Sequence, residues 1–324
     1  MAAGADGGDT ARASAGRNWG VEWAAPDISA APRPESRGSA APAPASTRPG
    51  IPRLGPMTVS DVLDGAFAIL KAAPATIIAF TAVFAVPVHL LGAWLQRDLL
   101  AGGSFLDAFE QGDTSLTGVD QGGSMSGTWA QVVLFFGPAL ALVFVAAAIV
   151  RLVGAWHTGR DLSLSELLRG SVPMAWPLLA SWTLVHLAEL VGMLACGFPA
   201  LAVMTWFLVT APVIGAEHLG PVKAMRRSAR LVGRRFWPVM GLVLLAGIVS
   251  ALFGYALSLV PTVVSLLVGT SGYWWLLTAA SGVLSSVITM PIVAATTVLI
   301  YLDLRVRTEG LDLELDAIDA FPAA

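Results

Sequence analysis

Six stretches of about 20 predominantly apolar residues occupy most of the chain, and they constrain the fold more than any other feature. A helix needs about 20 such residues to cross the hydrocarbon core of a bilayer. Tryptophans and a tyrosine lie near the ends of these stretches, where amphipathic rings favour the membrane–water interface. The pattern predicts six transmembrane helices at approximately residues 75–95, 130–150, 175–194, 197–216, 238–259 and 274–302.

Charged residues are too scarce for a soluble domain. They make up 13% of the 324 residues, against about 25% in soluble proteins, and hydrophobic residues make up 56%. The formal net charge of −3 argues against a nucleic-acid-binding protein, which carries a concentrated basic face. The single cysteine, Cys196, excludes an intramolecular disulfide and any multi-cysteine metal site. The sequence therefore predicts an all-α integral membrane bundle whose partner is the lipid bilayer.

The two ends of the chain differ in composition from the apolar middle. Residues 1–56 are rich in Ala, Pro and Gly and contain no long apolar run, so we expect a disordered tail rather than a signal peptide. Residues 57–307 form the expected six-span membrane domain. Residues 308–324 are expected to form a short acidic tail.

Lysine and arginine are distributed unevenly between the connecting segments. The segment 217–235 holds six of them and the segment 151–174 holds Arg151, Arg160 and Arg169. On the other side, residues 96–129 hold only Arg97, and residues 260–273 hold no charge. Because cytoplasmic loops carry the basic excess, we expect a multi-pass protein of the cell membrane with both termini in the cytoplasm.

A short amphipathic segment precedes each odd-numbered span, at residues 60–66, 165–171 and 222–228. Ser60 is placed to cap the first segment, and Ser163 and Glu166 have the spacing of a capping box at the second. Short helices with one apolar face are expected to lie in the membrane interface. The sequence thus predicts a threefold repeat of an interfacial helix and two spans. Internal repeats occur in transporters, but duplication also builds inert scaffolds.

His186 and Glu189 are the ionisable residues expected deepest in a span. They lie three residues apart on the same helical face, within pairing distance. A carboxylate at that depth costs a few kcal/mol unless it is paired, hydrated or protonated. Two interpretations remain open: a polar pocket or proton-coupled site between the repeats, and a purely structural pair.

A cluster of basic residues on the cytoplasmic side is the second candidate site. Its members are Lys223, Arg226, Arg227, Arg230, Arg234 and Arg235. Recognition of anionic lipid headgroups and simple determination of topology both need basic residues at this position. Residues 303–314, directly after the last span, alternate in charge and are expected to pair with this cluster.

The sequence contains none of the motifs that usually mark an enzyme or a cofactor site. The four histidines lie on four separate segments, and HExxH, CxxC, Gly-rich phosphate-loop and GxSxG motifs are absent. We therefore expect no catalytic, cofactor-binding or metal-binding residues and no cofactor.

Three stretches carry a family resemblance: residues 57–67, residues 206–237 and residues 301–314. Together they resemble the actinobacterial multi-span membrane proteins named for the glycerophosphoryl diester phosphodiesterase membrane domain. The resemblance covers residues 57–316 and implies a helical membrane protein of unknown biochemical role. The family takes its name from relatives that carry a phosphodiesterase domain. That catalytic domain is a barrel of alternating strands and helices and needs about 250 further residues. The tail does not provide them, so the enzyme activity is not expected here.

The leading interpretation is a non-enzymatic scaffold, accessory or regulatory unit of the membrane, whose protein partner the sequence does not indicate. The alternative is a small transporter or a lipid-handling protein. A carrier of ions or polar solutes usually needs several inward-facing ionisable residues, and here His186 and Glu189 are nearly alone.

Overall fold

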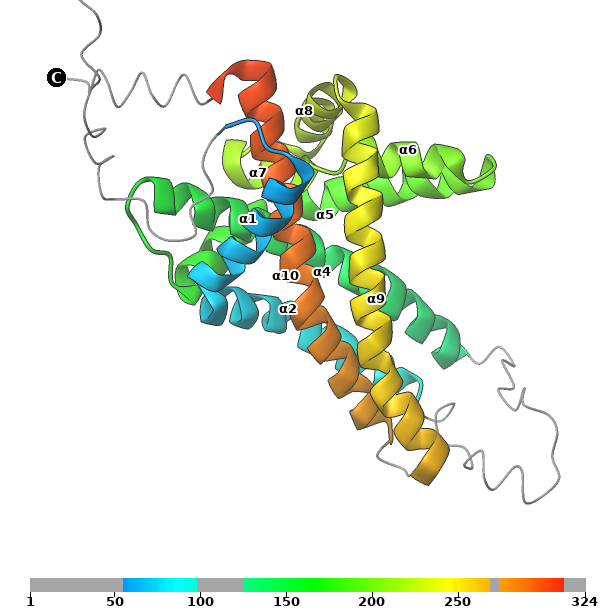
Figure 1. Cartoon of the computed structure of the whole chain (residues 1–324). Helices are drawn as coiled ribbons and strands as arrows, with labels where there is room; N and C mark the ends of the chain where they lie inside the picture. The colour runs from blue at the N-terminus through cyan, green and yellow to red at the C-terminus, as the bar shows by residue number, and fades with distance from the viewer. Residues whose placement is uncertain (1–54, 98–124, 269–273, 312–324) are drawn as a thin grey trace, which may run out of the picture. The chain divides into compact units, whose positions relative to one another are not determined.

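The computed structural model describes residues 55–97, 125–268 and 274–311, and all regular structure within these ranges is helical (Figure 1). The helices are α1 (Val59–Ala72), α2 (Pro74–Leu95), α4 (Met125–His157), α5 (Leu164–Leu194), α6 (Phe198–Trp206), α7 (Thr210–Glu217), α8 (Pro221–Gly233), α9 (Phe236–Val268) and α10 (Trp274–Glu309).

Six segments of the described chain are long and apolar enough to cross a membrane, as the sequence predicts. They are Pro74–Leu95, Thr128–His157, Leu164–Leu194, Phe198–Glu217, Phe236–Pro261 and Trp274–Glu309. Each overlaps one of the six predicted spans. The described residues therefore confirm the all-α architecture, with six helical segments long and apolar enough to span a membrane.

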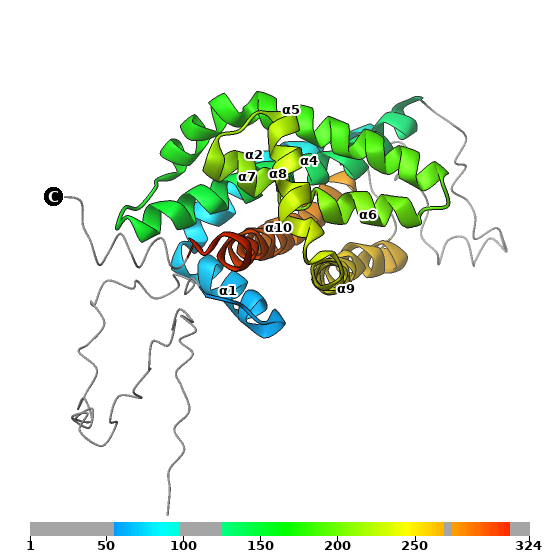
Figure 2. The same cartoon turned by 90° about the horizontal axis from the view of Figure 1, so that it is seen from above.

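The last span forms the centre of the molecule. α10 packs against α1, α2, α4 and α9, and Figure 2 shows it between α1 and α9. Leu299, Tyr301 and Leu304 on α10 are almost completely buried. The facing half of α4 contributes Val145 and Leu152 to the same core. Among the six candidate spans of the described chain, α10 is therefore the most deeply buried.

Glycines allow the closest approaches between helices. A Cβ atom at Gly215 in α7 would lie 2.7 Å from the carbonyl oxygen of Ala147 in α4. One at Gly192 in α5 would lie 2.6 Å from the backbone nitrogen of Ala200 in α6. Membrane helices pack closely through such small residues, because lipid supplies no hydrophobic force between them.

The fourth span is interrupted near its middle. α6 ends at Trp206, α7 begins at Thr210, and the Thr210 N–H donates to the Phe207 carbonyl three residues earlier. Pro212 has no N–H, so the Leu208 carbonyl also lacks its helical donor. The sequence predicts one continuous span at residues 197–216. The interruption leaves carbonyl groups that other elements must satisfy.

The short amphipathic segments differ from one another. Residues 59–72 form the separate helix α1, but its N-cap is Thr58 and not the expected Ser60, because Thr58 and Asp61 form a reciprocal capping box. The expected box of Ser163 and Glu166 is confirmed at the start of α5. There, however, the short segment and the third span form one helix of 31 residues.

Several predictions fall outside the described residues. The tail 1–56 is described only at its last two residues, and the acidic tail 308–324 only as far as residue 311. Residues 98–124, most of the predicted connecting segment 96–129, also lie outside.

Candidate functional site: the charged end of the molecule

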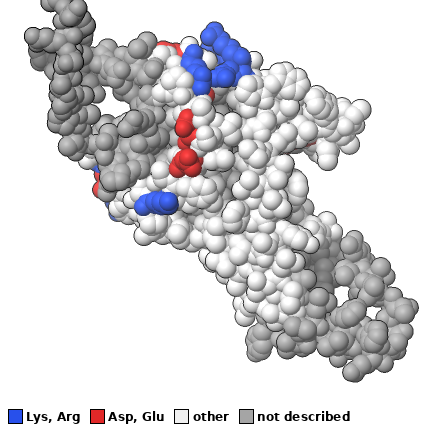
Figure 3. Space-filling model, viewed as in Figure 1, with Lys and Arg blue, Asp and Glu red and all other residues white. Residues whose placement is uncertain are grey.

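α8 carries most of the basic residues and is strongly amphipathic. Its buried residues, Ala224, Ser228, Leu231 and Val232, recur at helical spacing and face the rest of the molecule. Figure 3 shows Lys and Arg side chains gathered around α8, while most of the remaining described surface in the same view is uncharged. We call this region, where α7, α8, the start of α9 and the end of α10 meet, the charged end.

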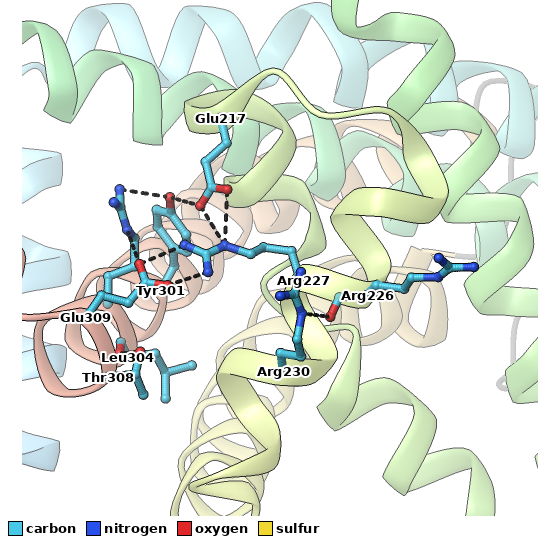
Figure 4. Close-up of polar contacts among 9 residues, drawn as sticks. Glu217, Arg226, Arg227, Arg230, Tyr301, Leu304, Thr308 and Glu309 are labelled. Carbon is cyan, nitrogen blue, oxygen red and sulfur yellow. Dashed lines mark hydrogen bonds and ion pairs between the residues drawn. The ribbon is translucent and has the colours of Figure 1, made fainter.

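Arg227 turns inward from α8 and joins two other helices. Its Nε donates to both carboxylate oxygens of Glu217 at the end of α7, at 3.2 and 3.1 Å. Its Nη2 donates to Glu309 Oε2 at 2.7 Å, and its Nη1 forms an ion pair with the other oxygen of Glu309 at the end of α10 (Figure 4). One guanidinium therefore holds α7, α8 and α10 together.

Two further side chains complete this arrangement. The Tyr301 hydroxyl donates to Glu217 Oε1 at 3.0 Å, and Arg305 Nε donates to Glu309 Oε2 at 3.1 Å. We call Glu217, Arg227, Tyr301, Arg305 and Glu309 the charge cluster. Its two arginines and two carboxylates balance, so the cluster as a whole is neutral.

The charge cluster is shielded enough to be stronger than a surface ion pair. Its charged side chains retain only 19% to 28% of their accessible surface. The hydrogen bonds from Arg227 to Glu309, with the charge of Glu217, raise the pKa of Arg227 above its ordinary value although burial opposes this. Arg227 therefore stays protonated, and removing one partner leaves the others poorly compensated.

The interrupted fourth span gives α8 a second attachment. The Ser228 hydroxyl, fully buried beneath α8, donates to the Trp206 carbonyl at 2.8 Å. Trp206 is the last residue of α6, where carbonyl groups lose their helical donors. The interruption and the orientation of α8 are thus linked through one hydrogen bond.

The other predicted basic residues are not brought into the charge cluster. Lys223, Arg226, Arg230 and Arg234 are exposed, and Arg235 is half-buried. Figure 4 shows Arg226 directed away from the charge cluster, and Arg230 Nε donates only to the Arg226 carbonyl at 3.4 Å. The predicted patch therefore divides into one inward arginine and five cations outside the cluster.

His186 and Glu189 lie together on α5, as their spacing predicts. His186 Nε2 is 3.8 Å from Glu189 Oε2, and its Nδ1 lies 2.9 Å from the Trp182 carbonyl. The ring of Trp182 lies 4.4 Å from that of His186, and the ring of Phe136 from α4 packs edge-on against it. The Trp182 indole N–H is buried without a partner in the described structure. His186 and Glu189 therefore form a small polar pair, with aromatic rings packed against the histidine.

Two features of the structure were not predicted from the sequence. The pairing of Arg227 with Glu309 confirms the expected contact between the basic cluster and residues 303–314, but Glu217 and Tyr301 were not expected in it. A second hydrogen bond, of 2.6 Å, joins His89 on α2 to Ser286 on α10. Its partners are 197 residues apart, so no local pattern signals it.

The chemistry available at the charged end is electrostatic. Arginines bind carboxylates and phosphates through planar, bidentate hydrogen bonds. Within the described ranges, no group of three His, Cys, Asp or Glu side chains is arranged to hold a metal ion. No protein-family model, curated protein or solved structure matches the chain.

Proposed function

We propose that this protein is a non-enzymatic scaffold, accessory or regulatory unit of the cell membrane. Its six spans anchor the chain, both termini lie in the cytoplasm, and the charged end lies at the inner membrane surface. The orientation is supported by the basic excess in the segments 151–174 and 217–235.

The charge cluster is the observation that carries this proposal. Its two arginines pair with its two carboxylates, at distances typical of hydrogen-bonded ion pairs. This arrangement fastens three helices, and it leaves five other cations at the same end outside the cluster. A fixed basic surface at the membrane face suits an assembly partner or acidic lipid headgroups better than it suits a chemical step.

We further propose that the three amphipathic segments are related repeats that lie in the interface. α1 and α8 are separate short helices followed by spans, and both have one buried face. In the middle unit the corresponding segment is continuous with its span in α5. We also propose that the chain is related to the membrane-domain family that it resembles. Two of the stretches that carry this resemblance, residues 206–237 and 301–314, contain the residues of the charge cluster.

Reciprocal co-purification tests the scaffold proposal. The full-length tagged protein is extracted in a mild detergent, and its co-purifying proteins and lipids are quantified by mass spectrometry. We expect one protein at near-equal stoichiometry, which recovers this chain when it is itself tagged. An unrelated six-span protein from the same membrane serves as the control. A specific lipid with no stoichiometric protein would contradict the scaffold proposal.

A small transporter or lipid-handling protein is the second candidate, favoured by the polar contacts inside the spans. His186 contacts Glu189 on α5, and His89 contacts Ser286 between α2 and α10. Intramembrane ionisable groups often mark substrate or proton pathways. The substitution Glu189→Gln keeps the shape and removes the charge. If the pair is structural, this variant melts like wild type and complements loss of the gene; normal melting with failed complementation favours transport.

A further inference from the structure

A groove at the charged end is lined by residues of α1, α9 and α10. In the cartoon α10 lies between the other two helices (Figure 2). The cavity of the groove measures about 210 Å³. The apolar walls are Val59 and Val62 from α1, Val239 and Leu242 from α9, and Ile300 and Leu304 from α10. The groove therefore brings α1 together with α9 and α10, which follow it only much later in the sequence.

The mouth of the groove holds one uncompensated charge. Arg235 lines the cavity and is half-buried, and no acid or hydrogen-bond acceptor pairs with its guanidinium among the described residues. The other charged lining residue, Asp303, is already neutralised. Its Oδ1 accepts from Arg307 Nε at 2.8 Å and from the Met57 N–H at 2.7 Å. The mouth therefore attracts an anion.

The position of Arg235 in the chain reinforces this attraction. It directly precedes α9, and its carbonyl accepts the Val239 N–H at 3.1 Å. The first N–H groups of a helix lack internal partners and carry partial positive charge. Exposed Arg234 adds another cation beside it.

The groove also extends from the level expected for the membrane interface into the apolar part of the span. Trp237, in the first turn of α9, is 66% exposed, as expected for an indole at the membrane interface. Leu242 lies more than one helical turn further along α9, in the span Phe236–Pro261. An occupant must therefore present an anion at one end and a hydrocarbon chain at the other.

We propose that this groove binds one anionic phospholipid, with its phosphate at Arg235 and an acyl chain against Val239, Leu242 and Ile300. The assignment rests on the proposed placement of the charged end at the membrane surface. Free phosphate gains nothing from the apolar walls. A zwitterionic lipid shares the acyl chain but carries no net charge for Arg235 to neutralise, so we expect it to bind more weakly.

Native mass spectrometry of the purified, delipidated full-length protein tests the groove. Dioleoyl-phosphatidylglycerol is added to wild type and to Arg235→Gln, with dioleoyl-phosphatidylcholine as the neutral lipid. We expect Arg235→Gln to reduce retention of phosphatidylglycerol about fivefold, the equivalent of about 1 kcal/mol for one basic residue at the surface. Arg226→Gln removes the same charge from the exposed face of α8, outside the groove, and should reduce retention less than Arg235→Gln does.

A second variant tests the apolar part of the site. Val59 is half exposed at the start of α1, so Val59→Trp should fill the groove without disturbing the core. With an unchanged melting temperature, it should reduce retention of phosphatidylglycerol at least as much as Arg235→Gln. Unchanged retention in Val59→Trp would overturn the acyl-chain assignment. Protection of the protein against thermal unfolding by inorganic phosphate alone would overturn the lipid assignment in favour of a free anion.

The matched variants separate the groove from the proposed function. Equal losses in Arg226→Gln and Arg235→Gln would overturn the groove while leaving a diffuse basic surface intact. Equal retention of both lipids by wild type would overturn the groove and the acidic-lipid contact together. The scaffold proposal is decided separately, by reciprocal co-purification of its protein partner.

Discussion

α9 and α10 are neighbours of similar length and similar hydropathy, yet they are buried to very different degrees. In the most apolar stretch of α10, 56% of the residues are buried inside the molecule, against 6% in α9. α10 contacts helices on several sides, whereas α9 packs mainly against α10. Hydropathy therefore measures compatibility with lipid here and does not measure burial.

The residue types explain the difference better than the hydropathy does. The buried part of α10 includes Ala294, Ala295, Thr296 and Thr297, which allow close approach of neighbouring helices. α9 instead exposes the large side chains of Ile248, Leu252, Phe253 and Val260. α10 thus forms the structural centre, and α9 forms a boundary with the bilayer and one wall of the groove.

Truncating one leucine in α10 and one in α9 should give the largest difference in stability between the two helices. Leu299→Ala in α10 removes a fully buried side chain, so we expect a loss of about 2–5 kcal/mol in the free energy of unfolding. Leu252→Ala in α9 removes a side chain that is 64% exposed, and we expect little change. Thermal unfolding of both variants in one detergent compares them. Equal losses in the two variants would show that the Leu252 side chain is packed against protein, and would contradict the exposed position of α9.

Removing Arg227 tests whether the charged end of α10 is held as firmly as its core. Arg227→Gln leaves Glu217 and Glu309 without their shared partner, and we expect a loss of about 2 kcal/mol. Arg226→Gln is the matched control, since Arg226 is exposed and lies outside the charge cluster. Thermal unfolding in detergent measures both. Similar melting of the two variants would mean that the charge cluster contributes nothing to stability.

The smallest expected effect concerns the attachment of α8 to the interrupted span. Ser228→Ala removes the hydroxyl that donates to the Trp206 carbonyl, so we expect a loss of about 1 kcal/mol. Ser250→Ala in α9 is the control, because the Ser250 hydroxyl has no such hydrogen bond within the described ranges. Denaturation curves resolve a difference of this size. If the Ser250 variant loses as much, the Ser228 bond has no special role.

The spans could be predicted from the sequence because each is a local property of about 20 residues. The capping box of Ser163 and Glu166 was predictable for the same reason. The charge cluster was predictable only in part. Alternating charges after α10 indicated pairing, but the choice of Arg227 for Glu309 depends on how residues 82 positions apart are packed.

The remaining features depend entirely on tertiary packing. The interruption between α6 and α7 follows from Pro212 and from the availability of Ser228 on another helix. The contact of His89 with Ser286 and the groove around Arg235 join segments remote in sequence. No hydrophobic pattern encodes which exposed cation faces a cavity and which faces water.

Both the proposed function and the lipid groove depend on the placement of the charged end at the cytoplasmic surface, which cysteine accessibility can test. In a background without Cys196, one cysteine is introduced at Gly233, where a side chain meets open space at the end of α8. A second variant carries its cysteine at Gly118, in the segment that precedes α4. Intact cells are treated with a membrane-impermeant thiol reagent, with permeabilised cells as the control. We expect labelling at Gly118→Cys in intact cells and at Gly233→Cys only after permeabilisation; the reverse pattern would place the charged end on the outer side of the membrane.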